Sequence, residues 1–264
     1  MSFNSFSIAA SGLNALQHEL EITANNLSNA HSIGYKKDIV NTSDSFYKNL
    51  QSSAIQENEE FSLRPAGIKI GTGTKITSVT KNFSVGENKQ TGRKLDVFLS
   101  NSGFISVNLP NGQRGYTRNG SFYRDNNTGR LIDFKGRVIS SEITIPESYQ
   151  IEHIFITEDG KFQYKNPTDN TIEDLGNLEL FTFNNLDGLE ESGEGIFLAT
   201  ESSGEEIAID SNLYKIRQQY LEISNVDVFK ELIALMRIQR LYEMNTRILK
   251  VSDEIAKETN NIKT

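Results

Sequence analysis

Apolar side chains recur with a heptad period at the amino-terminal end of the chain. Positions spaced alternately by three and four residues are occupied by Phe6, Ala9, Leu13, Leu16, Leu20, Thr23, Leu27 and Ala30. A mainly apolar seam that continues for more than three heptads is typical of a helix that packs along another helix. The sequence predicts that this helix ends near Asn29, because residues 32–34 favour a left-handed or turn conformation.

A second apolar stripe occupies the carboxy-terminal end of the chain. It consists of one row with a spacing of seven and a neighbouring row: Leu241, Ile248, Ile255 and Ile262, beside Leu235, Tyr242, Leu249 and Ala256. Residues 224–227 offer N-cap side chains, and neither proline nor glycine interrupts the run, which predicts a helix of about 35 residues and roughly 50 Å. Asn245 and Ser252 lie within the stripe, where polar residues usually fix the register between helices.

Small residues in the amino-terminal helix predict a close approach between helices. Gly12 lies near Ala9, Ala10 and Ala15. A glycine costs an isolated helix about 1 kcal/mol relative to alanine. We therefore interpret Gly12 as a packing position rather than a ligand site.

The middle of the chain changes to short β-rich runs separated by turn residues. Pro110-Asn111-Gly112 and Asn126-Asn127-Thr128-Gly129 each separate two such runs. Asn-Gly and similar pairs between runs of this kind predict β-hairpins. Residues 38–70 are polar and serine-rich, and we interpret them as an extended segment that is too long for a simple connection.

These patterns predict an α+β fold in which long amino- and carboxy-terminal helices pack as a coiled-coil-like pair, with an antiparallel β domain inserted between them. The predicted parts are an assembly helix and cap (1–37), the extended segment (38–70), the β domain (71–210) and a second assembly helix (211–264). Each helix alone can bury too little apolar surface to be stable, so we expect both helices to need further helical neighbours.

The composition of the chain argues against several classes of partner and site. The net charge of −8 argues against nucleic acid or an anionic membrane as the main partner. The chain has no cysteine, which excludes disulfides and zinc–sulfur sites. Only 36% of the residues are hydrophobic, and we expect neither a cleaved signal peptide nor a membrane-spanning segment. These facts alone predict a cytoplasmic protein, unless a dedicated machine exports the chain.

No group of residues predicts catalytic, cofactor-binding or metal-binding chemistry. The glycine pair in residues 71–74 lacks the lysine of a phosphate loop, and we interpret it as a bulge or turn before a strand. Asp125, Arg118 and Arg124 are interpreted as surface charges of a hairpin. The acidic residues between 190 and 206 lack the ligand spacing of a calcium loop, which favours a solvated surface.

Three stretches together resemble the bacterial flagellar rod and hook protein family. They are "SGLNALQHELEITANNLSNAHSIGYKK" (11–37), "QTGRKLDVFLSNSGFISVNLPNGQRGYTRNGSFYRD" (90–125) and "LEISNVDVFKELIALMRIQRLYEMNTRILKVSDEI" (221–255). Hook proteins are generally much longer, so the length favours a rod subunit. Residues 62–75 look most like those of subunits in the distal part of the rod, although a proximal rod subunit remains an alternative.

The resemblance implies a structural, self-assembling subunit of the drive shaft that transmits torque from motor to hook. The implied partners are copies of the chain itself in a helical homopolymer, neighbouring rod and hook subunits, the flagellar export apparatus, and the L and P ring proteins. The implied location is the periplasmic rod of the basal body, reached without a cleaved signal peptide. A secreted β-rich adhesin is a second hypothesis, but it gives no reason for the two matched terminal helices. A carbohydrate-active enzyme is a third hypothesis, but the sequence offers no pair of carboxylates for its chemistry.

We expect the assembly interface to combine the helix seams with amide side chains at the helix ends. An asparagine side chain both donates and accepts hydrogen bonds, so it can fix the register between subunits. The predicted interface residues are Phe6, Leu13, Leu16, Leu20, Asn25, Asn26, Leu27, Asn29, Gly34, Tyr35, Asn225, Leu235, Gln239, Arg240, Leu241, Tyr242, Asn245, Ile248, Leu249 and Ile255.

Overall fold

The computed structural model describes residues 2–49 and 69–262, which form two compact units. Among these residues, unit 1 contains 2–27, 38–49, 69–80 and 228–262, and unit 2 contains 28–37 and 81–227. The prediction of an α+β chain with a long helix at each end and antiparallel strands is confirmed.

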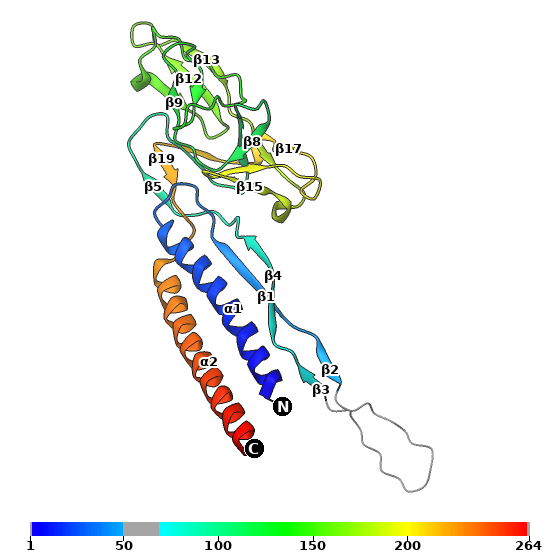
Figure 1. Ribbon diagram of the computed structural model, residues 1–264. Helices are drawn as coiled ribbons and strands as arrows, with labels where there is room; N and C mark the ends of the chain where they lie inside the picture. The colour runs from blue at the N-terminus through cyan, green and yellow to red at the C-terminus, as the bar shows by residue number, and fades with distance from the viewer. Residues whose placement is uncertain (1, 50–68, 263–264) are drawn as a thin grey trace. The chain divides into compact units, whose positions relative to one another are not determined.

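Unit 1 contains the two long helices. Helix α1 spans Ser2–Ser28 and α2 spans Val228–Ile262, so the predicted helix boundaries are confirmed at Asn29 and after residue 227. The helices run in opposite directions (Figure 1), with Arg237 Nη2 3.6 Å from Glu19 Oε1. Within the described residues, neither helix combines the length and apolarity that crossing a bilayer requires.

A two-stranded ribbon completes unit 1 (Figure 1). It is formed by β1 (Asp38–Asp44) with β4 (Thr74–Lys81) and by β2 (Tyr47–Asn49) with β3 (Lys69–Gly71). Lys48 pairs with Ile70 in antiparallel register. The predicted turn of residues 71–74 lies between β3 and β4, and Gly73 within it has a φ of 113°.

Part of the predicted extended segment is therefore paired with the chain that follows it. Of its apolar residues, Phe46 and Tyr47 lie on the ribbon with 80% and 60% of their surface exposed. The others, Leu50, Ile55, Phe61 and Leu63, lie outside the described residues.

Unit 2 is built from antiparallel strands and three 3₁₀ turns. A six-stranded sheet has the order β15-β16-β8-β7-β14-β17, a three-stranded sheet has the order β11-β12-β13, and β18-β6, β19-β5 and β10-β9 form pairs. The strands are β5 (Asn88–Gln90), β6 (Val97–Leu99), β7 (Phe104–Asn108), β8 (Arg114–Thr117), β9 (Tyr123–Arg124), β10 (Leu131–Ile132), β11 (Ile154–Ile156), β12 (Lys161–Lys165), β13 (Ile172–Asn177), β14 (Leu180–Thr182), β15 (Glu190–Gly193), β16 (Ile196–Leu198), β17 (Ile207–Ala208), β18 (Ile216–Gln218) and β19 (Tyr220–Glu222). The 3₁₀ turns are η1 (Ile151–His153), η2 (Leu186–Gly188) and η3 (Ser211–Leu213).

The predicted hairpins are present in unit 2. Strands β7 and β8 pair around residues 109–113, and β9 and β10 pair around residues 125–130. Gly112 and Gly129 have φ values of 81° and 69°, which glycine adopts without the steric cost that a side chain brings. Asp125 accepts hydrogen bonds from the backbone N–H groups of Asn127 and Thr128, so its carboxylate shapes the second turn.

Two hydrophobic clusters hold unit 2 together. The larger one is mainly aliphatic and unites β6, β7, β11, β12, β14, β16 and β18. The smaller one is aromatic and consists of Phe83, Phe104, Tyr116, Phe181, Phe183 and Phe197. Its rings meet edge to face, as for Tyr116 and Phe183 at 4.8 Å between centroids, an arrangement that the ring quadrupoles favour.

Candidate functional site

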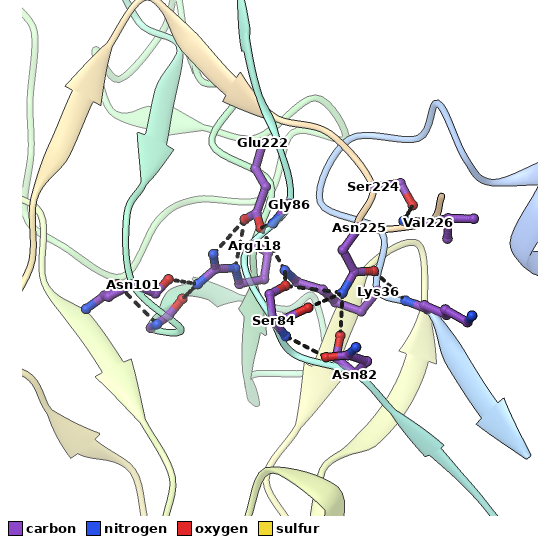
Figure 2. A network of polar contacts seen from close by, with 12 residues as sticks. Lys36, Asn82, Ser84, Gly86, Asn101, Arg118, Glu222, Ser224, Asn225 and Val226 are labelled. Atoms are coloured by element: carbon purple, nitrogen blue, oxygen red, sulfur yellow. Dashed lines mark hydrogen bonds and ion pairs between the residues drawn. The ribbon is translucent and has the colours of Figure 1, made fainter. Parts of the chain in front are cut away.

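A buried polar network joins three distant parts of unit 2 around the carboxylate of Glu222 (Figure 2). Glu222 Oε1 accepts hydrogen bonds from Lys36 Nζ at 2.7 Å and from the backbone N–H of Gly86 at 2.7 Å. Its Oε2 accepts from Arg118 Nη2 at 2.6 Å and from Arg118 Nε at 3.0 Å. We call Lys36, Gly86, Arg118 and Glu222 the Glu222 junction.

The junction contains two cations and one carboxylate, all shielded from water. The side chains of Lys36, Arg118 and Glu222 are 0–1% exposed. Lys36 Nζ also donates to the carbonyl oxygen of Ser84 at 2.6 Å, and Arg118 Nη1 donates to backbone carbonyls of the loop before β7. Buried charges require partners, and the junction has one carboxylate for two cations. The backbone carbonyls supply the further hydrogen-bond acceptors that the cations need.

Burial dominates the titration of both cations. Together with the nearby Arg118 charge, it lowers the pKa of Lys36 from 10.5 to about 8, although the Glu222 carboxylate opposes the shift. Burial also lowers the pKa of Arg118, again opposed by Glu222. The positive charge on Lys36 is therefore held against a desolvation cost that the carboxylate only partly offsets.

Asn225 extends the junction through its side-chain amide (Figure 2). Its Oδ1 accepts from the backbone N–H of Lys37 at 2.8 Å, and its Nδ2 donates to the Asn82 carbonyl at 2.8 Å and to Ser84 Oγ at 3.0 Å. The backbone N–H of Gly34 donates to the Glu222 carbonyl oxygen at 2.9 Å. The segments before β1 and before α2 are thereby fixed to each other and to residues 82–86.

Asn26 has a comparable role within unit 1. It is 1% exposed, and its side-chain amide makes two hydrogen bonds with Asp38, one to the backbone N–H and one to the carbonyl, both at 2.9 Å. These bonds join the end of α1 to the start of β1. Asn25 is exposed, whereas Asn29 accepts a hydrogen bond from Ser32 Oγ at 3.1 Å in the turn after α1.

The predicted apolar residues of α1 are mostly half-buried. Leu13, Leu16, Leu20 and Leu27 belong to this group, while Phe6 is 52% exposed. The chain passes close to α2 at Gly12, where a Cβ would lie 3.6 Å from Asn245 Nδ2. Gly12 is therefore confirmed as a contact between the two helices. An alanine at this position would still fit, because its Cβ would meet Asn245 at an ordinary van der Waals distance.

The two predicted rows on α2 differ in exposure. The row of Leu241, Ile248 and Ile255 is exposed, whereas Leu235 and Leu249 of the other row are half-buried and only Tyr242 of that row is exposed. Asn245 is half-buried, and Gln239 and Arg240 are exposed. More apolar side chains of α2 are also at least 40% exposed: Phe229, Leu232, Ile233, Met236, Met244, Val251 and Ile262. Monomeric proteins rarely leave such a continuous apolar surface in water, so this face is typical of an interaction surface.

The remaining predicted residues lie next to the junction. Gly34 is buried with a φ of 68°, and a Cβ there would lie 3.1 Å from the backbone of Arg118. Tyr35 is half-buried, and Lys81 Nζ lies 5.5 Å from its ring centroid. The structure thus places the predicted residues in two groups, one along the helices of unit 1 and one around Glu222 in unit 2.

Sequence reasoning missed the charged members of the junction. The prediction of Arg118 as a surface charge is wrong, because the residue is 2% exposed and paired with Glu222. A usable signal was present, since Lys36 and Glu222 carry opposite charges in the two terminal motifs. The acidic residues after β14 are largely surface residues, as predicted, and Glu191 and Glu206 form ion pairs with Lys81 and Arg114.

The described residues contain no group of histidines and carboxylates arranged to hold a metal ion. The junction also offers no accessible nucleophile or proton donor, since its charged side chains are buried and bonded to one another. The Glu222 junction fixes chain segments to one another within unit 2. In unit 1, α2 presents an exposed apolar face.

Comparison with known protein families matches three parts of the chain. Residues 6–36 match the model "Flagella basal body rod protein", and residues 98–164 match "Flagellar hook protein FlgE/F/G D1 domain". Residues 217–262 match "Flagellar basal body rod FlgEFG protein C-terminal". The first and last matches cover most of α1 and α2.

Similar proteins extend over nearly the whole chain. The flagellar basal-body rod protein FlgG of Borreliella burgdorferi is 35% identical over 258 residues, which cover 97% of each chain. FlgG of Caulobacter vibrioides is 30% identical with the same coverage, and FlgG of Bacillus subtilis is 30% identical over 96% of each chain. The chain therefore belongs to the family of flagellar basal-body rod proteins.

Proposed function

We propose that this chain is a structural subunit that self-assembles into the distal part of the flagellar rod, where it transmits torque between motor and hook. The observation that carries the proposal is the exposed apolar face of α2, which includes Leu241, Ile248 and Ile255. Burying one such side chain contributes roughly 1.5–3 kcal/mol, so repeated contacts between copies supply enough free energy for a stable polymer. The similarity to proteins named FlgG favours the distal rod.

In the proposed assembly, the terminal helices of many subunits form an inner tube. The half-buried seams of α1 and α2 pack as a coiled-coil-like pair within a subunit, and the exposed residues of the predicted interface contact other copies. The β domain between the helices forms an outer sleeve. Torque then passes through many similar interfaces rather than through one strong contact.

The proposed partners follow from this location. Neighbouring rod and hook subunits contact the ends of the segment that this chain builds, and the L and P ring proteins surround it. The flagellar export apparatus delivers the subunit to the periplasm. The described residues 38–49 of the extended segment are proposed to lie along adjacent subunits and to stiffen the rod.

Truncation tests the proposal directly. The purified full chain should form sedimenting polymers above a critical concentration, and removal of residues 241–264 should abolish sedimentation. Unit 2 should show the same urea transition in both proteins, because its clusters contain no residue of α2. A truncated chain that polymerises at the same critical concentration would contradict the proposal.

Deletion of the gene tests the position of the subunit. Electron microscopy of basal bodies from the deletion strain should show a rod that lacks its distal part. A rod that lacks its proximal part as well would instead favour a proximal subunit.

A further inference from the structure

An open groove lies between α1 and β4 in unit 1. Its volume is about 430 Å³, and its lining is mainly apolar. The apolar part is formed by Ala15 and Ile22 of α1 and by Ile76 and Val79 of β4, and the rest by Ser11, Asn14, His18, Thr74 and Lys75. Val79 is 49% exposed, so the groove presents apolar surface to water in the single chain.

One end of the groove is fixed by a close contact between α1 and the ribbon. Ser11 Oγ accepts a hydrogen bond from the backbone N–H of Thr74 at 3.3 Å. A Cβ on Gly73 would lie 2.0 Å from the same oxygen, so the approach requires glycine there. The contact of Ser11 with Gly73 and Thr74 therefore determines the distance between α1 and the ribbon at this end of the groove.

The exposed row of α2 matches the groove in length and chemistry. Leu241, Ile248 and Ile255 lie seven residues apart, which places successive side chains about 10 Å apart along one side of the helix. The α1 wall of the groove runs from Ser11 to Ile22 and is roughly 16 Å long. Two successive side chains of the row fit within this length.

Filament symmetry decides between the surfaces that the row can contact. If the row packed against the same row of a second copy, a two-fold pair would form, and that contact would be complete after two chains. An open filament needs contacts in which one surface meets a different surface of the next copy. The groove supplies such a different surface, and it is apolar.

We propose that the groove between α1 and β4 receives the row Leu241, Ile248 and Ile255 from α2 of a second copy of this chain. This inference rests on the proposed function, because it assumes a self-assembled filament. Beyond the proposed function, it specifies which surface of one subunit contacts which surface of the next subunit.

Cysteine cross-linking tests the inference, since the natural chain contains no cysteine. His18→Cys places a thiol at the groove rim, and Leu241→Cys, Ile248→Cys and Ile255→Cys place one on the row. A disulfide requires Cα atoms closer than about 7 Å, so it reports direct neighbours. Each row variant is mixed with the groove variant, polymerised and oxidised, with Lys250→Cys on another side of α2 as the matched control.

We expect at least one row variant to form a mixed dimer with His18→Cys, at least tenfold more than Lys250→Cys forms, and only in the polymer. Polymers in which Ile248→Cys joins only to itself, or in which Lys250→Cys joins His18→Cys equally well, would overturn this inference and leave the proposed function standing. A full chain that forms no polymer would overturn both.

Discussion

Lys36 and Glu222 lie 186 residues apart in the sequence, yet Lys36 Nζ lies 2.7 Å from Glu222 Oε1. Both side chains are essentially inaccessible to water. The pair connects the motif that follows α1 with the motif that precedes α2, and Arg118 adds the middle of the chain to the same carboxylate. Contacts of this kind join residues from all three of the stretches that resemble the family within unit 2.

Removing the carboxylate of this junction should destabilise unit 2. Glu222→Gln leaves two buried cations without their counter-charge, and we expect the free energy of unfolding to fall by about 3–5 kcal/mol. Urea denaturation of the full chain measures the change. Glu158→Gln is the matched control, because its ion pair with Lys215 is exposed at 3.4 Å and should contribute little. Equal midpoints for Glu222→Gln and wild type would contradict the role of the junction.

The lowered pKa of Lys36 predicts a pH dependence of stability. Between pH 8 and 10.5 the folded chain releases the Lys36 proton while the unfolded chain keeps it, so the free energy of unfolding rises with pH in this window. Relative to that of Lys36→Met, the free energy of unfolding of the wild-type chain should rise by about 3 kcal/mol between pH 8 and 10.5. Below pH 7 the difference between the two proteins should not change with pH. Urea denaturation of both proteins at a series of pH values measures the difference. A difference that stays constant from pH 7 to 11 would show that Lys36 titrates normally.

Asn26 and Asn25 should respond differently to alanine. Asn26→Ala removes both hydrogen bonds between the Asn26 side chain and the backbone of Asp38, which should cost roughly 1–3 kcal/mol. Amide hydrogen exchange at the start of β1 measures the local loss. Asn25 is exposed, so Asn25→Ala should disturb exchange at β1 less than Asn26→Ala does and, if Asn25 belongs to the assembly interface, raise the critical concentration for polymerisation. The prediction fails if Asn25→Ala loosens β1 as much as Asn26→Ala does.

Gly12→Ala should not harm the single chain. The added Cβ meets Asn245 Nδ2 at an ordinary distance of 3.6 Å, and alanine favours a helix over glycine by about 1 kcal/mol. Hydrogen exchange in α1 should therefore slow slightly. Gly73→Ala serves as the opposite control, because its φ of 113° and the nearby Ser11 make a side chain unfavourable. Faster exchange in α1 of Gly12→Ala would show that the helices approach more closely than the structure indicates.

Local signals in the sequence were sufficient for the helices and the hairpins. The end of α1 is followed at once by a local turn, in which the Ser32 N–H donates to the Asn29 carbonyl, and β7 and β8 follow from the Asn111-Gly112 turn between two β-rich runs. Both features depend on neighbouring residues only, through backbone preferences that the sequence displays directly.

Features that depend on distant residues were not predictable in this way. Arg118 lies in a hairpin with polar neighbours, and nothing near it in the sequence indicates that Glu222 will bury it. The pairing of β1 with β4 joins polar strands without a clear alternation of apolar residues, so neither register nor partner was evident. Two of the predicted interface residues, Asn26 and Asn225, also make hydrogen bonds to distant backbone groups within the chain, which no local pattern indicated.

The most direct test of the account is the sedimentation of the full chain with one charge placed on the exposed row of α2. Ile248→Glu introduces a carboxylate into the face proposed to contact another copy, whereas Lys250→Glu introduces the same group on another side of the same helix. We predict that the critical concentration for polymerisation rises at least tenfold for Ile248→Glu and less than twofold for Lys250→Glu, with equal helix content in the two monomers. Polymerisation of Ile248→Glu at the wild-type critical concentration would contradict assembly through this face.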